Sequence, residues 1–214
     1  MSYAKLVSDW QFGFQTHELR EEFIKTYYGE GPAEHDYLKY YLLQPGDIYV
    51  EGGSNVGRTA FLAQAMGAKA VLIEPSPLNI QVIEKKIKEI DLNFTLVKKA
   101  LSKEKKVGFL VMAGGKADRI GESGDKIVVV EIDTLSNILS DLQISKVNLF
   151  ACDIEGQEVE VVKQLDPAVE LHLALACYHL GSEEKVQTQI TDVLKAKGYT
   201  NLVYEDGLVF GSAV

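Results

Sequence analysis

A glycine-rich turn flanked by carboxylates is the part of this sequence most capable of chemistry. Residues 47–57 read DIYVEGGSNVG, an apolar run that ends in Glu51 and then turns through Gly53, Asn55 and Gly57. Glycine permits left-handed backbone and the close approach of a ligand, and a following helix offers free N–H donors in its first turn. At the carboxyl end of a parallel strand, such a turn predicts a small-molecule site.

A second acidic residue favours a nucleoside ligand. Glu74 ends the next apolar run, where its carboxylate can accept hydrogen bonds from both hydroxyls of a ribose. A dinucleotide fingerprint requires G-x-G-x-x-G, but counting from Gly52 places Ser54 at its second glycine. Glu51 would also repel a pyrophosphate, whereas a carboxylate suits the ammonium and sulfonium groups of S-adenosylmethionine. We therefore expect S-adenosylmethionine as cofactor. The alternatives are an NAD(P)-dependent oxidoreductase and a turn that binds nothing.

Asp153 is the strongest candidate for a catalytic group. It ends a later apolar run, which a parallel sheet would place beside the glycine turn. Methyl transfer depends on orientation of the reactants, and a hydroxyl acceptor also needs a base. Asp153, or His179 after the next run, could be that base. Capping of the following helix is the structural alternative for Asp153, and a core or solvated histidine is an equally good account of His179.

A metal site is a weaker interpretation of the same segment. Glu155 and Glu158 could join Asp153 as oxygen ligands of magnesium or calcium. Acidic residues in the first turn of a helix more often complement the helix dipole. We therefore expect no metal ligands here.

The alternation of strand-like and helix-like runs predicts the α/β sheet that must position these groups. Predicted strands are residues 47–51, 70–74, 94–97, 147–153 and 171–178. Predicted helices are residues 58–66, 135–142 and 157–165, with two more that begin after the N-caps Ser76 and Ser182. Residues 107–112 and 127–132 are expected to pair as an antiparallel excursion, and Asp206-Gly207 is expected to close a C-terminal hairpin.

Residues 1–44 differ in character from the rest of the chain. They are rich in aromatic side chains, including Trp10, Phe12 and Phe14, and look helical in part. We predict an N-terminal extension ahead of a Rossmann-like domain of residues 45–214. A packing layer over the sheet edge and a cap over the acceptor pocket explain it equally well.

Five segments in this order resemble the successive motifs of FkbM-type methyltransferases: residues 47–57, 73–77, 100–102, 134–135 and 153–158. The resemblance implies a Rossmann-like class I methyltransferase fold, with a mostly parallel seven-stranded sheet whose last strand is antiparallel. It also implies a cofactor site. Its residues would be Glu51, Gly53, Asn55 and Gly57 at the methionine part, Glu74 at the ribose, Pro75 and Ser76 at the adenine, Ser102 beside the ring, and Asp153 at the methyl group.

Three positions depart from the family's pattern. Ala151 stands where lysine is usual, Ser136 stands where aspartate is usual after Thr-Leu, and Glu51 replaces aspartate conservatively. The first two concern the acceptor and the chemistry rather than the cofactor. They leave a cofactor-binding protein without catalysis as an alternative.

The composition narrows the partners. Lysine and arginine number 22 against 31 acidic residues, a net charge of −9, which disfavours non-specific binding to nucleic acid or an anionic membrane. No apolar run approaches the roughly 20 residues needed to span a bilayer, and no signal peptide is evident. Cys152 and Cys177 lack metal-site spacing and suggest a reducing compartment. We expect a cytoplasmic enzyme that methylates an oxygen of a small molecule or sugar.

Overall fold

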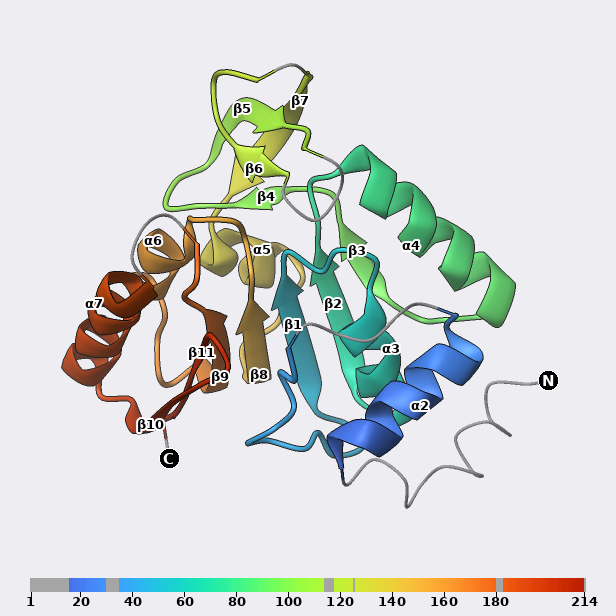
Figure 1. The fold of residues 1–214 in the computed structure, drawn as a ribbon, viewed down its shortest axis with the longest axis horizontal. Helices are drawn as coiled ribbons and strands as arrows, with labels where there is room; N and C mark the ends of the chain where they lie inside the picture. Colours follow the sequence, from blue (N-terminus) through green and yellow to red (C-terminus); the bar gives the residue numbers. More distant parts are fainter. Residues whose placement is uncertain (1–15, 30–34, 114–117, 125, 180–182, 214) are drawn as a thin grey trace.

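The structure of the chain, a computed structural model, describes residues 16–29, 35–113, 118–124, 126–179 and 183–213. Among these, seven strands form one sheet in the order β10-β11-β9-β8-β1-β2-β3 (Figure 1). β3, β2, β1, β8 and β9 are parallel neighbours, and β11 runs antiparallel to β9 and β10. The predicted mixed sheet is confirmed. The strands are β1 Ile48–Gly52, β2 Lys69–Ile73, β3 Thr95–Val97, β8 Val147–Cys152, β9 Glu170–Ala176, β10 Thr200–Glu205 and β11 Leu208–Ser212.

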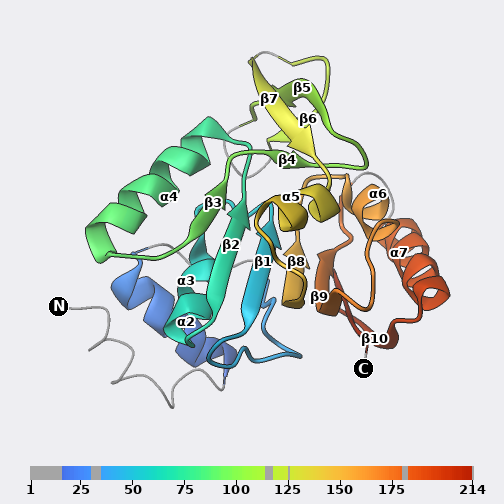
Figure 2. The same ribbon diagram turned by 180° about the vertical axis from the view of Figure 1, so that it is seen from behind.

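Helices cover both faces of the sheet because successive strand residues are apolar on both sides. In β1, Tyr49 belongs to the core beneath one set of helices and Val50 to the core beneath the other. The first set is α2 His17–Tyr27, α3 Arg58–Ala65 and α4 Pro77–Ile90 (Figure 1). The second set is α5 Leu135–Asp141, α6 Glu158–Val162 and α7 Glu183–Lys197 (Figure 2). No helix in the described ranges has the length and apolarity to cross a membrane.

A second, four-stranded sheet lies beyond the carboxyl ends of β1 and β2 (Figure 1). β5 and β7 pair antiparallel, with Phe109 opposite Val129, so the predicted excursion is confirmed. The sequence did not reveal β4 or β6, because two residues are too few to show a period. The strands, in spatial order, are β4 Ala100–Leu101, β7 Ile127–Asp133, β5 Lys106–Val111 and β6 Arg119–Ile120.

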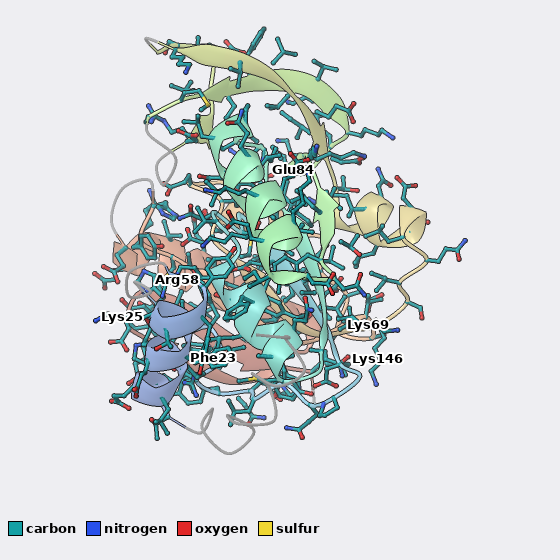
Figure 3. The ribbon with its side chains drawn as sticks, turned by 90° about the vertical axis from the view of Figure 1, so that its right-hand side faces the viewer. Phe23, Lys25, Arg58, Lys69, Glu84 and Lys146 are labelled. Carbon is teal, nitrogen blue, oxygen red and sulfur yellow. The ribbon has the colours of Figure 1, made fainter. Side chains whose placement is uncertain are left out.

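The described part of the N-terminal extension shares the core of the main sheet. Figure 3 shows α2 alongside α3, with Phe23 and Arg58 labelled. The Phe23 ring stacks on Phe61 with centroids 5.2 Å apart, and Arg58 forms an ion pair of 2.9 Å with Glu21. Tyr28 also stacks on Phe61, at 5.0 Å. The remaining predictions for this part of the chain, the aromatic residues Trp10, Phe12 and Phe14, lie outside the described residues.

The predicted element boundaries need only local corrections. α6 is shorter than the predicted helix of residues 157–165. Asp206 and Gly207 have φ of 51° and 77°, the left-handed pair expected of a two-residue hairpin turn. Both cysteines are buried and free. The predicted N-cap Ser182 lies outside the described residues.

The turn after β1 is packed tightly against the end of β8. Gly53 has φ of 75°, and a Cβ there would overlap the carbonyl oxygen of Asp153. The Asp153 N–H donates to the carbonyl oxygen of Gly52 at 2.9 Å. At Gly57, the N-cap of α3, φ is 81° and a Cβ would lie 2.9 Å from Leu72 Cδ2. Contacts within the chain therefore require both glycines, in addition to any approach of a ligand.

We predict that Gly53→Ala destabilises the fold by about 3 kcal/mol or more, because left-handed strain adds to a backbone clash. Gly46→Ala is the matched control. Gly46 also has positive φ, at 92°, but nothing lies within 4 Å of a Cβ there. We expect the control to cost about 1 kcal/mol. Urea unfolding of both variants would check this, and equal losses would contradict a special contact at Gly53.

Candidate functional site

A pocket opens at the carboxyl ends of β1, β2 and β8, next to the small sheet. Five of the residues predicted to bind the cofactor line it: Gly53, Asn55, Glu74, Pro75 and Asp153. Apolar side chains form another part of the wall, namely Ile73, Leu101, Leu110 and Ile120. The last two come from β5 and β6. The site thus combines an apolar wall with a row of carboxylates.

Glu74 holds the glycine turn to the start of α4. Its Oε2 accepts from the Asn55 N–H and its Oε1 from the Ser76 N–H, both at 2.8 Å. The Asn79 side chain also hydrogen-bonds to Glu74, so one lone pair of the carboxylate remains for a ligand. Burial raises the pKa of Glu74 to about 7, although the two backbone donors oppose the shift. Glu74 therefore shapes the pocket and can still accept a hydrogen bond from within it.

Glu51 is a buried carboxylate, and hydrogen bonding by Tyr49 and Thr59 only partly opposes the effect of burial on its pKa. It is only 5% exposed, and no described group hydrogen-bonds to its Oε2. Burial raises the pKa of Glu51 to about 8, with a further contribution from the charges of Asp153 and Glu74. Glu51 is not part of the pocket wall, and it precedes the lining residue Gly53 by two positions in the chain. A positive charge brought close to Glu51 would lower this pKa and favour the ionised form.

Ala151 explains why Glu51 lacks a counter-charge. The two residues are register partners across β1 and β8, and Ala151 is fully packed on the same face as Tyr49. A lysine at position 151 would place an ammonium group within reach of Glu51. Ser136, the other departure from the family pattern, is exposed on α5 and contacts Thr134 at 3.2 Å.

Besides Glu51, three residues predicted to bind the cofactor do not line the pocket: Gly57, Ser76 and Ser102. The Ser76 hydroxyl donates to Asp118 Oδ2 at 2.7 Å and does not cap α4, so the predicted side-chain cap is wrong. The Ser102 hydroxyl donates to Gln157 at 3.0 Å. Gly57 begins α3. The partner Asp118 does line the pocket, and sequence reasoning missed it because it lies in a loop without a recognisable pattern.

One carboxylate oxygen of Asp153 accepts hydrogen bonds from two tyrosine hydroxyls. Tyr37 and Tyr178 donate to Oδ2 at 2.8 Å and 2.5 Å. Its Oδ1 has no hydrogen-bond partner among the described residues, and lies 3.4 Å from His179 Nε2. Burial, with the negative charge of Asp153, raises the pKa of Tyr37 well above its ordinary value, so Tyr37 remains a donor. Sequence reasoning assigned neither tyrosine a role in the site.

His179 is surrounded by carboxylates. Its Nδ1 lies 3.1 Å from Glu158 Oε1 and its Nε2 lies 3.3 Å from Glu155 Oε2. Burial disfavours the imidazolium, but the hydrogen bond that His179 donates to Glu158 and the charges of Glu158, Asp153 and Glu155 outweigh it and raise the pKa of His179. The predicted pair Asp153 and His179 is therefore brought together, and the neighbouring acids favour the protonated form of the histidine.

Glu158 closes the turn that follows β8. It is 2% exposed, and its two oxygens accept from the N–H groups of Ile154 and Gly156 at 2.8 Å and 2.9 Å. Asp153, Glu158 and His179 each offer one atom within 4.8 Å of the others, close enough for a cation. However, Glu158 already uses both oxygens to hold the backbone. Glu158 is the final glutamate of the D-I-E-G-Q-E segment, and that glutamate is the sequence signal for these two backbone hydrogen bonds.

Comparisons with known proteins identify the fold. No protein-family model matches the sequence, and no curated protein is significantly similar to it. A methyltransferase from Pyrococcus furiosus superposes with a TM-score of 0.51 at 16% identity, over 94% of this chain and 98% of that chain. Precorrin-6y C5,15-methyltransferase from Geobacter metallireducens GS-15 gives 0.52 at 13% identity over 82% of each chain. Ribosomal protein L11 methylase from Lactobacillus delbrueckii subsp. bulgaricus gives 0.50 at 12% identity, over 82% and 73%. The chain has the predicted Rossmann-like methyltransferase fold.

The raised pKa of Glu51 predicts a pH-dependent cost to stability. Between pH 4.5 and about 8, Glu51 is protonated in the folded chain but ionised in the unfolded chain, so its contribution to stability falls as pH rises through this window. We expect Glu51→Gln to stabilise the free protein by about 1–3 kcal/mol at pH 8.5 and to change little near pH 4.5.

Thermal unfolding at both pH values would measure this effect. Glu22→Gln is the control, because Glu22 is exposed on α2. A Glu51 variant that is destabilised equally at both pH values would show that the carboxylate stabilises the free fold.

Proposed function

We propose that this protein is an S-adenosylmethionine-dependent methyltransferase that methylates a hydroxyl of a small molecule or sugar. The supporting observation is the charge of the pocket. Its described lining contains four carboxylates and no lysine, arginine or histidine: Glu74, Asp118, Asp153 and Glu155. Glu51, outside the lining, adds a further buried carboxyl group near the turn. Such a site suits a ligand with ammonium and sulfonium groups.

The same charges argue against a dinucleotide, the alternative function. A pyrophosphate is normally bound by free N–H donors and positive charge at a helix N-terminus. Here Asn55 N–H, in the turn itself, is already engaged by Glu74 at 2.8 Å. An NAD(P)-dependent oxidoreductase is therefore the weaker proposal.

The residues present fit S-adenosylmethionine part by part. Gly53 and Asn55 border the methionine part, whose ammonium Glu51 attracts. Glu74 accepts from a ribose hydroxyl with the lone pair that Asn55, Ser76 and Asn79 leave free. Pro75 and the apolar wall surround the adenine. Gly57, Ser76 and Ser102 support the wall from behind.

The motif order supports membership of the FkbM-type methyltransferases. The D-I-E-G-Q-E segment forms a single turn in which Glu155 and Gly156 have φ of 56° and 105° and Glu158 holds the backbone. The glutamate spacing of that motif thus has a physical reason in this chain. We base the family proposal on this turn together with the glycine turn at β1.

Asp153 is the proposed base. When bound, S-adenosylmethionine supplies an electrophilic methyl group. The Asp153 carboxylate would accept the hydrogen bond of the acceptor hydroxyl and take its proton during methyl transfer. His179, with its raised pKa, offsets the negative charge of the three neighbouring carboxylates.

Cofactor binding can be tested without knowledge of the acceptor. We expect S-adenosylhomocysteine to bind at micromolar concentrations in calorimetry, and NADH to give no heat. Glu74→Ala should weaken binding about 10- to 100-fold, because it removes hydrogen bonds to a charged acceptor. Glu74→Gln, which keeps one acceptor oxygen, should lose less. Glu84→Ala, at an exposed site on α4, is the control.

Thermal unfolding of each Glu74 variant separates lost ligand contacts from a loosened turn. Absence of both heat and thermal shift with either form of the cofactor would refute the proposed function.

The role of Asp153 predicts a separation of binding from transfer. We expect Asp153→Asn to bind S-adenosylhomocysteine with unchanged affinity and to transfer methyl groups about 100-fold more slowly, since an amide cannot act as the base. Labelled-methyl transfer to a panel of phenols, sugars and hydroxy acids would measure the rate, with Asp141→Asn as control. Equal rates in variant and parent would remove Asp153 from the mechanism. Binding by the parent without transfer to any acceptor would favour the non-catalytic alternative.

A further inference from the structure

A second cavity lies on the sheet face that carries Leu149, His172 and Ser212. These residues are register partners on β8, β9 and β11, so their side chains project to the same side of the sheet. The cavity has a volume of about 310 Å³, within the range of small-molecule pockets. Its described lining shares no residue with the pocket at the carboxyl ends of the strands.

Aromatic rings from the segment ahead of β1 form the opposite wall of this cavity. Tyr41 stacks on His172 with ring centroids 3.9 Å apart, and Tyr40 packs against Phe210 with centroids 4.7 Å apart. Tyr37 also lines the cavity. Aromatic rings attract one another in stacked and tilted arrangements, so these walls favour a ligand that brings a further ring.

The second cavity is uncharged, unlike the first pocket. Its described lining contains no aspartate, glutamate, lysine or arginine. Burial lowers the pKa of His172, although the charge of Asp47 opposes this shift, so the imidazole is neutral near pH 7. A charged ligand would lose its hydration here without gaining a counter-charge. The lining therefore favours a neutral ligand.

His172 is the polar side chain of the lining that can still bind a ligand. No described residue hydrogen-bonds to its ring, and the ring nitrogens remain accessible. A neutral imidazole offers one donor and one acceptor. Asn201 and Ser212 also line the cavity, but the Asn201 side-chain N–H already donates to Ser212 Oγ at 3.0 Å. A hydroxyl on the ligand ring would thus find its partner in His172.

We propose that the second cavity is a binding site for a neutral aromatic ring that carries a hydroxyl group. The ring packs against the tyrosines, and its hydroxyl pairs with His172. This site goes beyond the proposed function, because it is separate from the proposed cofactor pocket. Tyr37 connects the two, since it lines the second cavity while its hydroxyl donates to Asp153 at 2.8 Å. A ligand bound here would contact a side chain that also holds a carboxylate of the first pocket.

The probes 4-methylphenol and toluene test the proposal, because they differ only in the hydroxyl group. Carbon-13 labelled leucine methyl groups in the full-length chain report where each probe binds. Leu149 lines the second cavity and Leu110 lines the first pocket. We expect 4-methylphenol to shift the Leu149 signals with a dissociation constant of about 1 mM or less. Toluene should bind about 3- to 10-fold more weakly, since it lacks the hydrogen bond.

A variant of His172 tests the proposed hydrogen bond. His172→Phe removes the ring nitrogens and keeps a ring that can stack on Tyr41. We expect the affinity for 4-methylphenol to fall about 3- to 10-fold, close to that of toluene, and the affinity for toluene to stay unchanged. His17→Phe is the matched control, because His17 is exposed on α2 and does not line the cavity. Both affinities should be those of the parent in this control.

Each outcome decides the proposal. Absence of saturable shifts at Leu149 overturns it, and so do shifts confined to Leu110. Equal affinities for the two probes in the parent also overturn it, as does an unchanged affinity of His172→Phe for 4-methylphenol. If His172→Phe does not fold, the comparison of the two probes in the parent decides. These measurements use the protein without S-adenosylmethionine, so their failure is distinguishable from a failure of the proposed function.

Discussion

The contact between the Gly53 backbone and the carbonyl oxygen of Asp153 is the constraint on which the rest of the site depends. It brings the turn after β1 and the end of β8 together without a side chain between them. Glu74 then ties this turn to α4, and Glu158 ties the loop after β8. Hydrogen bonds from backbone N–H groups to buried carboxylates thus hold the loops of the pocket in place. The same carboxylates give this part of the molecule its negative charge.

Burial of these carboxylates brings two of their pKa values close to neutral pH. Burial brings the pKa of Glu51 to about 8 and that of Glu74 to about 7. A free site with several such groups holds protons that a cationic ligand would displace, so binding and ionisation are linked. The apolar packing on both faces of the sheet stabilises the fold and so offsets the cost of burying these carboxylates. Such a trade of stability against binding is common at functional sites.

Local sequence patterns predicted the features that depend on interactions between residues close in the chain. The alternation of elements, the Asp-Gly hairpin and the position of Glu74 all follow from neighbours within a few residues. Tyr37 could not be found in this way, because its hydroxyl meets Asp153 across 116 residues of sequence. Ser76 was placed correctly at the start of α4, but its hydroxyl prefers Asp118, 42 residues away. Long-range contacts of this kind depend on the assembled sheet and carry no signal in a single sequence.

The alanine at position 151, where the pattern of the resembling family has lysine, affects the electrostatics around Glu51. Its methyl group lies beside Glu51 across the two central strands, where a lysine would supply a permanent counter-ion. Alanine at this position supplies no such charge. The ammonium group of a bound ligand would be a counter-ion for Glu51, and this counter-ion would be lost when the ligand dissociates. Folding free energy and ligand concentration would then be coupled more strongly than in a protein that carries its own cation at this position.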